Sequence, residues 1–161
     1  MAEFDPKLAL EAAKYYEVPP ERLWALIDRE SSFDPSADPN PKSNDVGKGL
    51  TQLKPATAKE LGVKDIWDQK QNVYAGARYL RQQYEQFGDW DKAAAAYNQG
   101  PAGDFSKAND YVAYVNKKAK EYAAAKPWDV KVQNPLSSEQ EHPDGTISAN
   151  TNPWYKQVYE N

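Results

Sequence analysis

The fold is decided around the stretch Leu23-Trp24-Ala25-Leu26-Ile27-Asp28-Arg29-Glu30-Ser31-Ser32-Phe33. Read as a helix, it places Leu23, Leu26, Ile27 and Glu30 on one face, at spacings of three and four residues. Three of these side chains are apolar, and the fourth is a carboxylate where another aliphatic side chain would be expected. Burial raises the pKa of an unpaired carboxyl group, so that it can donate a proton near neutral pH. The alternative, which periodicity alone favours, is that Glu30 turns out to solvent at the helix end.

Size and composition narrow the chemistry that is available. The chain has 161 residues, enough for one domain with a proper core and short for two. A net charge of −4 argues against a nucleic-acid partner. There is no cysteine, and the one histidine, His142, lies in a polar C-terminal segment, so neither a thiol nucleophile nor a histidine-built metal site is expected. Catalysis would rest on carboxylates, hydroxyls and amides, with no metal and no cofactor.

The chain shows no targeting or membrane signal. Its N-terminus lacks a basic start followed by an apolar run, so no secretory signal is expected. No apolar run approaches the roughly 18 residues that a transmembrane helix needs. We therefore expect no transmembrane segment.

Periodicity and capping signals predict a mainly helical fold. Helices are expected over about residues 6–17, 20–30, 55–61, 68–86, 91–99 and 110–122. Asp89 or Asp91 would cap the fifth helix, and Asn109 or Asp110 the sixth. We find no convincing strand, although a small hairpin within residues 34–48 is an alternative.

The chain divides into a helical domain, residues 1–126, and an extended polar tail, residues 127–161. The tail is rich in Pro, Asn, Ser, Glu and Thr, a composition typical of disorder or linkers. It nevertheless carries four aromatic rings, those of Trp128, Trp154, Tyr155 and Tyr159. We expect the tail to dock through these rings on its own domain or on a partner.

Two further segments draw attention to Glu30. Residues 34–48 form a loop of about fifteen residues directly after it, and loops of that length in a compact domain are usually functional or disordered. Gly47 and Gly49 then suggest a close backbone approach or a positive φ.

Four consecutive alanines, residues 93–96, would let their helix pack closely against its neighbours at the centre of the domain.

Five motifs occur in a telling order. They are Glu30-Ser31-Ser32-Phe33-Asp34-Pro35, Gly49-Leu50-Thr51-Gln52-Leu53 with Pro55-Ala56-Thr57-Ala58, Asn72 with Gly76-Ala77-Arg78-Tyr79-Leu80, Ala96-Tyr97-Asn98-Gln99-Gly100, and Tyr111-Val112. Together they resemble the soluble lytic transglycosylase domain, which is related in fold to goose-type lysozyme. The resemblance covers about residues 8–122. It implies a single, mainly α domain of the lysozyme-like α+β superfamily, with a groove for a glycan strand.

The resemblance also implies an activity. The family cleaves the β-1,4 bond between N-acetylmuramic acid and N-acetylglucosamine in peptidoglycan, and the sugar's own 6-hydroxyl closes on the anomeric carbon to give a 1,6-anhydro product. Glu30 matches the catalytic acid, which would act alone as general acid and base. Gln52 matches a substrate-binding residue, and Ser43 a partner for the N-acetyl group or for Glu30.

Three more residues are implied in substrate binding. Tyr97 and Asn98 match the family's Tyr-Asn pair, with the Tyr97 hydroxyl close to the acid. Tyr111 would line the groove or merely start a helix. Ordinary structural roles remain open for the others: Tyr97 as a core ring, Asn98 as a helix cap and Gln52 as a surface amide.

Several positions depart from the family pattern. Thr51 and Lys54 stand where Met is common, Val46-Gly47 replaces Gly-Ala, and Lys107 with Ala108 replaces Glu with Thr. We expect these changes to lie at the groove and to alter its affinity for glycan rather than the reaction.

Two other functions remain open. A hydrolytic muramidase on the same fold would use Asp34, Asp38 or Asp45 to position a water molecule. A virion structural or docking protein would keep the fold without activity. The motifs and compact size are similar to wall-degrading domains of internal virion proteins of short-tailed bacteriophages. We therefore expect a phage virion or lysis protein that acts in the periplasm or cell wall, with glycan strands and other virion proteins, through residues 127–161, as partners. The alternative is a bacterial periplasmic enzyme whose signal was removed.

Overall fold

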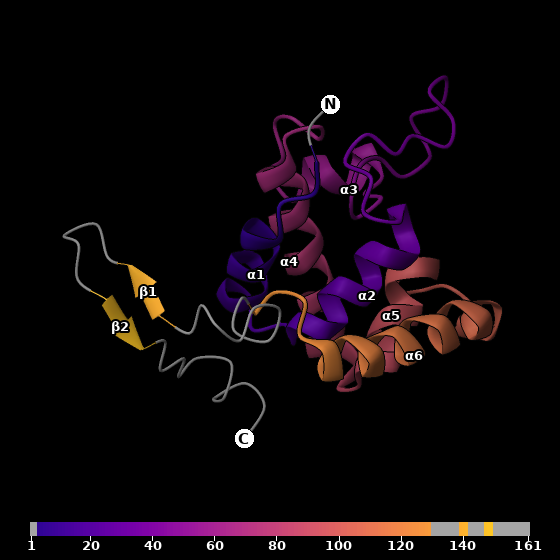
Figure 1. Cartoon of the computed structure of the whole chain (residues 1–161). Coiled ribbons are helices and arrows are strands. Elements are labelled where there is room, and N and C mark those ends of the chain that lie inside the picture. Colours follow the sequence, from indigo (N-terminus) through magenta and orange to yellow (C-terminus); the bar gives the residue numbers. More distant parts are fainter. Residues whose placement is uncertain (1–2, 130–138, 142–146, 150–161) are drawn as a thin grey trace.

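The computed structural model describes residues 3–129, 139–141 and 147–149. The described chain forms helices α1 (Pro6–Tyr15), α2 (Pro20–Ser31), α3 (Pro55–Glu60), α4 (Gln69–Phe87), α5 (Trp90–Gln99) and α6 (Asn109–Ala125), with a 3-10 turn, η1 (Phe105–Ala108), before α6 (Figure 1). The mainly helical prediction is confirmed. None of these helices is long and apolar enough to cross a membrane.

One expectation about strands is wrong. Strands β1 (Glu139–Glu141) and β2 (Ile147–Ala149) form an antiparallel pair. Strands of three residues are too short to show the alternation by which a strand is recognised in a sequence. The alternative hairpin within residues 34–48 is not formed; the nearest pairing is a single bridge between Lys48 and Leu53.

The starts of the helices follow from their sequences, with one exception. Prolines occupy the first position of α1, α2 and α3, where a missing backbone N–H costs nothing. Asp89, one of the two expected caps, accepts a hydrogen bond from the backbone N–H of Lys92 at the start of α5. The cap expected for α6 is wrong: Ala108 holds that position, because η1 runs directly into the helix.

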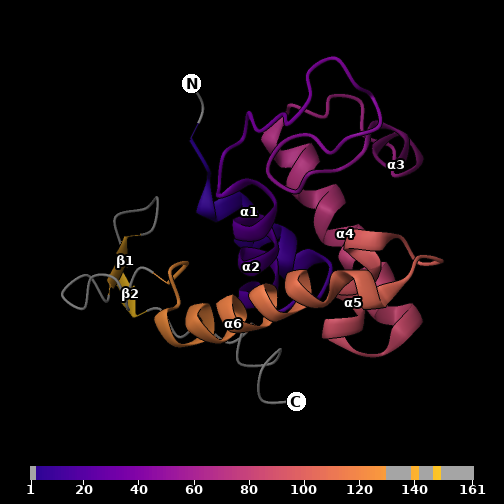
Figure 2. The ribbon, with the colours of Figure 1, turned by 90° about the vertical axis from the view of Figure 1, so that its right-hand side faces the viewer.

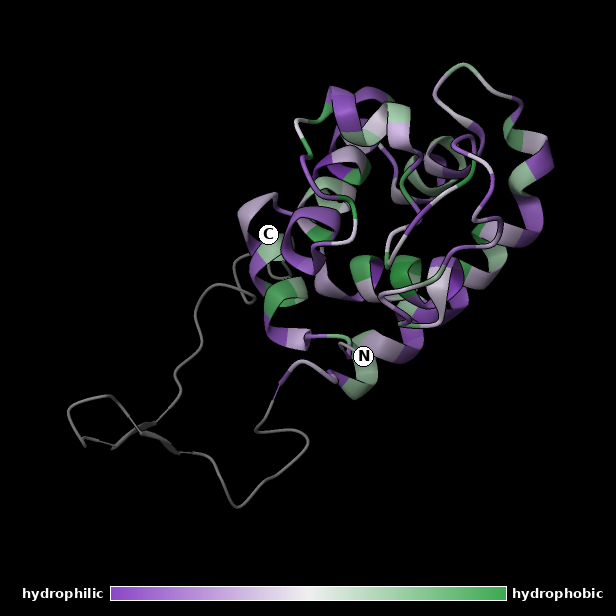
Figure 3. Ribbon diagram, turned by 90° about the horizontal axis from the view of Figure 1, so that it is seen from above, coloured by the Kyte–Doolittle hydropathy of each residue, from purple (hydrophilic) through white to green (hydrophobic). Residues whose placement is uncertain are grey.

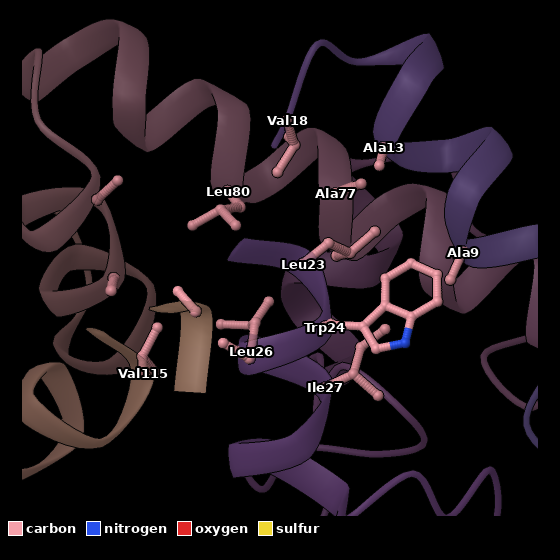
Figure 4. Packing of buried hydrophobic residues seen from close by; sticks show 14 of the residues in the cluster. Ala9, Ala13, Val18, Leu23, Trp24, Leu26, Ile27, Ala77, Leu80 and Val115 are labelled. Carbon is pink, nitrogen blue, oxygen red and sulfur yellow. The ribbon is translucent and has the colours of Figure 1, made fainter. Parts of the chain in front are cut away.

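The hydrophobic core is built around α2. Leu23, Leu26 and Ile27 are fully buried, and Figure 4 shows them between side chains of α1, α4 and α6. Each such side chain contributes roughly 2 kcal/mol of burial free energy. Helix α6 lies alongside α2 (Figure 2). In Figure 3, hydrophobic and hydrophilic segments alternate along single helices, as expected for helices with one buried face.

The alanine-rich helix α5 packs as expected. Residues 93–96 are all buried, and α5 contacts both α4 and α6. Their small side chains allow α5 to approach both neighbouring helices closely.

The long loop after α2 is held onto the domain. It projects at the upper right of Figure 1. The buried Lys48 ammonium lies 2.5 Å from a carboxylate oxygen of Asp38 and 3.0 Å from the carbonyl oxygen of Asn40. The backbone N–H of Gly49 donates to the carbonyl of Ala37. These bonds fix both ends of the loop to one another.

The position of Trp128 bears on the boundary predicted at residue 127. Trp128, expected in the tail, packs edge-on against Trp24 of the core, with ring centroids 5.1 Å apart. Trp154, Tyr155 and Tyr159 lie outside the described residues, so the docking of the tail stays a prediction.

Candidate active site

A cavity of about 340 Å³ opens at the C-terminal end of α2. Glu30 lines it together with residues 47 and 52–54, Thr57 of α3, Tyr79 of α4, and residues 97–100 at the end of α5. Segments far apart in the sequence therefore meet at one carboxyl group. We call this space the Glu30 cavity.

Glu30 is the acid that the sequence indicated. It follows the buried Leu23, Leu26 and Ile27 on the same face of α2 and ends that face at the cavity. Burial raises the pKa of its carboxyl group from 4.5 to about 7, while the hydrogen bond from Tyr111 and the charge of Arg29 lower it less. Glu30 thus holds a proton near neutral pH and can also release it.

Tyr111 holds the acid in place. Its hydroxyl donates a 2.5 Å hydrogen bond to Oε1 of Glu30. Tyr111 itself is buried at the start of α6, and burial is the main reason why its own pKa lies well above the ordinary value. It is not among the residues that line the cavity. Two roles were left open for Tyr111, lining the groove and starting a helix. The structure places it at the start of α6, and its hydrogen bond to Glu30 is a role that the sequence did not indicate.

The backbone after Glu30 is strained. Ser32 and Phe33 both adopt positive φ angles, 50° and 63°, in the left-handed region that glycine favours. Such conformations cost of order 1 kcal/mol or more each and persist only where surrounding contacts impose them. The last turn of α2 therefore depends on its neighbours.

Tyr97 shares the cavity with Glu30 but does not bond to it. Its hydroxyl donates a 2.6 Å hydrogen bond to the carbonyl of Thr51, and its ring packs edge-on against Tyr79. Burial, followed by the nearby charge of Glu30, raises the pKa of Tyr97 well above its ordinary value. Tyr97 remains a neutral phenol beside the acid.

Thr51 corrects an expectation. The sequence placed this departure at the groove, yet Thr51 is fully buried. Its backbone N–H and its hydroxyl both donate to Oδ1 of Asn72, at 3.0 and 2.7 Å. A Cβ on Gly76 would lie 2.5 Å from the Thr51 side chain, so the glycine leaves room for it. Thr51 belongs to the scaffold that presents its carbonyl to Tyr97.

The other departures divide between the cavity and elsewhere. Lys54 and Gly47 line the Glu30 cavity, as expected. Lys107 is exposed on η1 and Ala108 is buried, and neither lines the cavity. Val46, next to Gly47, does not line the cavity either. The expectation that all of these changes lie at the groove is therefore wrong for Val46, Thr51, Lys107 and Ala108.

Gln52 forms one wall of the cavity. Its amide nitrogen donates to the carbonyls of Ala37 and Gly49, at 3.1 and 2.9 Å. Within the described part of the chain its amide oxygen accepts no hydrogen bond, which leaves that oxygen available to a ligand. A Cβ on Gly47 would lie 2.3 Å from the Gln52 carbonyl oxygen, which explains the first glycine. Glycine is favoured at position 49 because the backbone there has a positive φ.

Of the two remaining predicted site residues, the structure brings one to the cavity. Asn98 lines it, and its amide oxygen accepts a hydrogen bond from Gln99. Ser43 does not; it lies in the long loop, where its hydroxyl accepts from the backbone N–H of Asp45.

Sequence reasoning missed some of the lining. Tyr79, Thr57 and Gln99 were quoted only as parts of motifs, with no site role. Tyr79 lies one turn after Gly76 on α4 and lines the cavity. Its place within a motif gave no indication of a role at the site.

Among the described residues that line the cavity, Glu30 is the only acid. Asp38 is paired with Lys48, and the Asp34 carboxylate accepts hydrogen bonds from Ser36, which lower its pKa. Asp45, the third acid considered for a hydrolytic water, also lies outside the lining. Within residues 3–129 and the two strands, no cluster of acidic or histidine side chains resembles a metal site.

A comparison with known proteins identifies the family that this chain matches. The family described as "Transglycosylase SLT domain" matches residues 7–123. The chain is 39% identical to a transglycosylase of Enterobacteria phage PRD1 over 90 residues, which are 55% of this chain and 32% of that protein. It is 41% identical to the membrane-bound lytic murein transglycosylase F of Desulfosudis oleivorans over 87 residues, 50% of this chain and 18% of that protein.

A solved structure supports the same placement. The fold matches lytic transglycosylase Slt of Pseudomonas aeruginosa, solved as an inactive glutamate-to-glutamine mutant, with a TM-score of 0.64 and 25% identity. The match covers 73% of this chain and 24% of that one. This chain thus spans a third or less of the length of each of these proteins.

Proposed function

The chain belongs to the transglycosylase SLT family, and we propose that it is a peptidoglycan lytic transglycosylase. It would cleave the β-1,4 bond between N-acetylmuramic acid and N-acetylglucosamine and leave a 1,6-anhydro-N-acetylmuramic acid end. The observation that carries this proposal is a single carboxyl group, Glu30, with a pKa raised to about 7, alone among acids in the cavity lining.

One carboxyl group suffices for this reaction. Protonated Glu30 gives its proton to the glycosidic oxygen as the bond from that oxygen to the anomeric carbon breaks. The 6-hydroxyl of the same muramic acid then forms a bond to the anomeric carbon and gives its proton to the Glu30 carboxylate. The acid is thereby restored, with no water consumed. Because the nucleophile is tethered to the substrate, proximity replaces the second carboxylate that most glycosidases need.

The neighbours of Glu30 have distinct roles in this proposal. Tyr111 orients the acid through its hydrogen bond. The free amide oxygen of Gln52 and the side chain of Asn98 would bind sugar hydroxyl or N-acetyl groups. Tyr97 would offer its ring to the glycan, since its hydroxyl is committed to Thr51. Ser43 would take part only if the long loop brought it to a bound glycan.

The test is a digestion of purified peptidoglycan followed by mass spectrometry. We expect anhydro-muropeptides from the natural chain and none from Glu30→Gln, because the amide cannot transfer a proton. Glu11→Gln is the matched control, since Glu11 is exposed on α1. Products with reducing ends only would favour the hydrolytic muramidase. Equal turbidity loss with the natural chain and Glu30→Gln, or none with either, would favour a docking protein.

We also propose where the protein acts. Its substrate lies in the bacterial cell wall, and similarity to the PRD1 transglycosylase supports a phage origin, with virion proteins as partners through residues 127–161. A chain that ends at residue 129 tests the tail. If the tail packs on its own domain, the truncated chain melts at a lower temperature than the full chain. If the tail serves a partner, the two melt together.

A further inference from the structure

A second carboxylate on α2 is bound entirely by α6. The hydroxyl of Tyr114 donates to Oδ1 of Asp28 at 2.8 Å, and the hydroxyl of Tyr122 donates to Oδ2 at 2.5 Å. Both oxygens of Asp28 are thus engaged by tyrosines that are eight residues apart on one helix. Asp28 does not line the Glu30 cavity.

The same turn of α2 makes further contacts with α6. The Arg29 guanidinium lies 5.2 Å from the ring centroid of Tyr111 and 6.0 Å from that of Tyr114. Glu30 receives the Tyr111 hydroxyl. Three consecutive residues before the end of α2, 28–30, are therefore each held by tyrosines of α6.

This turn needs such support. Ser32 and Phe33 hold strained left-handed conformations immediately after it, and unwinding the end of α2 would relieve them. Tyr122 contacts the chain both before and within the strained segment. Its hydroxyl donates to Asp28, and its ring packs edge-on against Phe33, with ring centroids 6.2 Å apart.

We propose that Asp28 is a positioning residue for the reaction. By binding the hydroxyls of Tyr114 and Tyr122, it keeps the last turn of α2 wound and holds Glu30 within reach of Tyr111. The inference rests on the proposed function of Glu30. Asp28 acts through this arrangement and touches no substrate.

The two hydrogen bonds to Asp28 can be removed without changing the groups that surround Glu30. Within the described residues, the charged and titratable groups around Glu30 are Arg29 on its own helix, Tyr111 on α6, Tyr97 on α5, Tyr79 on α4, and Lys54 at the cavity edge before α3. The double variant Tyr114→Phe/Tyr122→Phe alters none of these five. It keeps both rings and removes only the two hydroxyls that bind Asp28.

The double variant should lower kcat about tenfold and leave KM within about twofold, since small displacements of a catalytic group cost rate rather than binding. The ionisation in kcat/KM should move to higher pH, because a looser Tyr111 bond stabilises the Glu30 carboxylate less. Asp28→Asn keeps one acceptor oxygen and should lose less activity than Asp28→Ala. Tyr15→Phe/Tyr16→Phe, at the C-terminal end of α1, is the matched control and should leave kcat, KM and the pH of this ionisation unchanged.

If the two hydrogen bonds to Asp28 only stabilise the fold, the double variant will melt at a lower temperature but keep a normal kcat and an unchanged pH profile. That result would overturn the proposal. If the double variant does not fold, Tyr114→Phe alone replaces it, since Tyr114 is partly exposed. A carbon-13 carboxyl titration of Glu30 by NMR, without substrate, separates the two proposals. If the natural chain yields no anhydro product, the proposed function fails. The positioning role is then judged by whether the Glu30 titration moves upward in the variant.

Discussion

The hydroxyl of Tyr111 lies 2.5 Å from Oε1 of Glu30, although the two residues are 81 positions apart in the chain. This bond joins the last turn of α2 to the first turn of α6. It sets the orientation of Glu30, the only acid that the described part of the chain places in the cavity lining, and it opposes the rise in the pKa of Glu30 that burial imposes.

Tyr111→Phe should shift the pH dependence of activity. A hydrogen bond donated to a carboxylate favours the charged form, so its loss should raise the pKa of Glu30 above 7, by about one to two pH units for a charge-assisted bond. The descending limb of kcat/KM should move to higher pH by that amount, with a lower kcat because the acid is no longer oriented. Initial rates on soluble glycan strands, measured across pH 5 to 10, provide the check. Tyr15→Phe should leave the limb in place, and a shift of the Tyr111→Phe limb to lower pH would contradict this account.

Glu30→Gln should stabilise the protein, but only at high pH. Because the pKa of Glu30 is raised from 4.5 to about 7 on folding, its carboxylate destabilises the fold progressively between pH 4.5 and 7, and fully above pH 7. Glutamine carries no such charge. The variant should therefore gain up to about 3 kcal/mol in free energy of unfolding above pH 7 and nearly nothing below pH 4.5.

Urea denaturation at pH 4.5 and pH 8.5 measures this difference. Glu11→Gln, on the exposed face of α1, should show no comparable gain between the two conditions. An equal effect of Glu30→Gln at both pH values would mean that the Glu30 carboxyl has an ordinary pKa.

Gly76→Ala should destabilise the protein even though alanine favours helices. The propensity gain is about 1 kcal/mol, but the new Cβ would lie 2.5 Å from the Cβ and Cγ2 atoms of the buried Thr51. Forcing the two segments apart should cost about 1–3 kcal/mol net. Thr51→Ser removes the clashing Cγ2 methyl group, so the double variant should recover part of the loss in a thermodynamic cycle. Strictly additive effects would show that the two side chains do not compete for space.

Lys48→Met should loosen the long loop. Methionine fills similar space but leaves Asp38 without its ion pair, at a cost of about 2 kcal/mol. We expect faster proteolytic cleavage within residues 34–47 and a higher KM, because the same loop carries the Ala37 carbonyl that binds Gln52. Lys42→Met, exposed in that loop, is the control. Unchanged cleavage rates would assign the loop's order to its backbone bonds alone.

Local patterns predicted the helices well, and they placed Glu30 on the buried face of one of them. Proline starts, aspartate caps and the spacing of Leu23, Leu26 and Ile27 are properties of neighbouring residues, and these residues form α2 as expected. The motif order also brought Gln52, Tyr97 and Asn98 to the cavity of Glu30. Whether these three bind glycan stays a prediction.

Hydrogen bonds between distant segments could not be predicted in this way. The hydroxyl of Tyr97 was expected beside the acid but bonds to Thr51, and Tyr111 binds the acid instead. A tyrosine hydroxyl lies about 6.5 Å from its Cα, so small differences in how two helices cross decide which oxygen it meets. Thr51 was misplaced for a related reason: a threonine in a polar loop gave no sign that Asn72 would bury it.

The packing of Trp128 against Trp24 also bears on how the chain folds as it is made. Trp24 belongs to the central helix and is synthesised early, but one of the two rings that pack edge-on against it comes 104 positions later, beyond the end of α6. Until residue 128 has emerged from the ribosome, the indole of Trp24 has only the ring of Phe4 of that pair against it. The core around Trp24 is therefore completed only after α6 has been made.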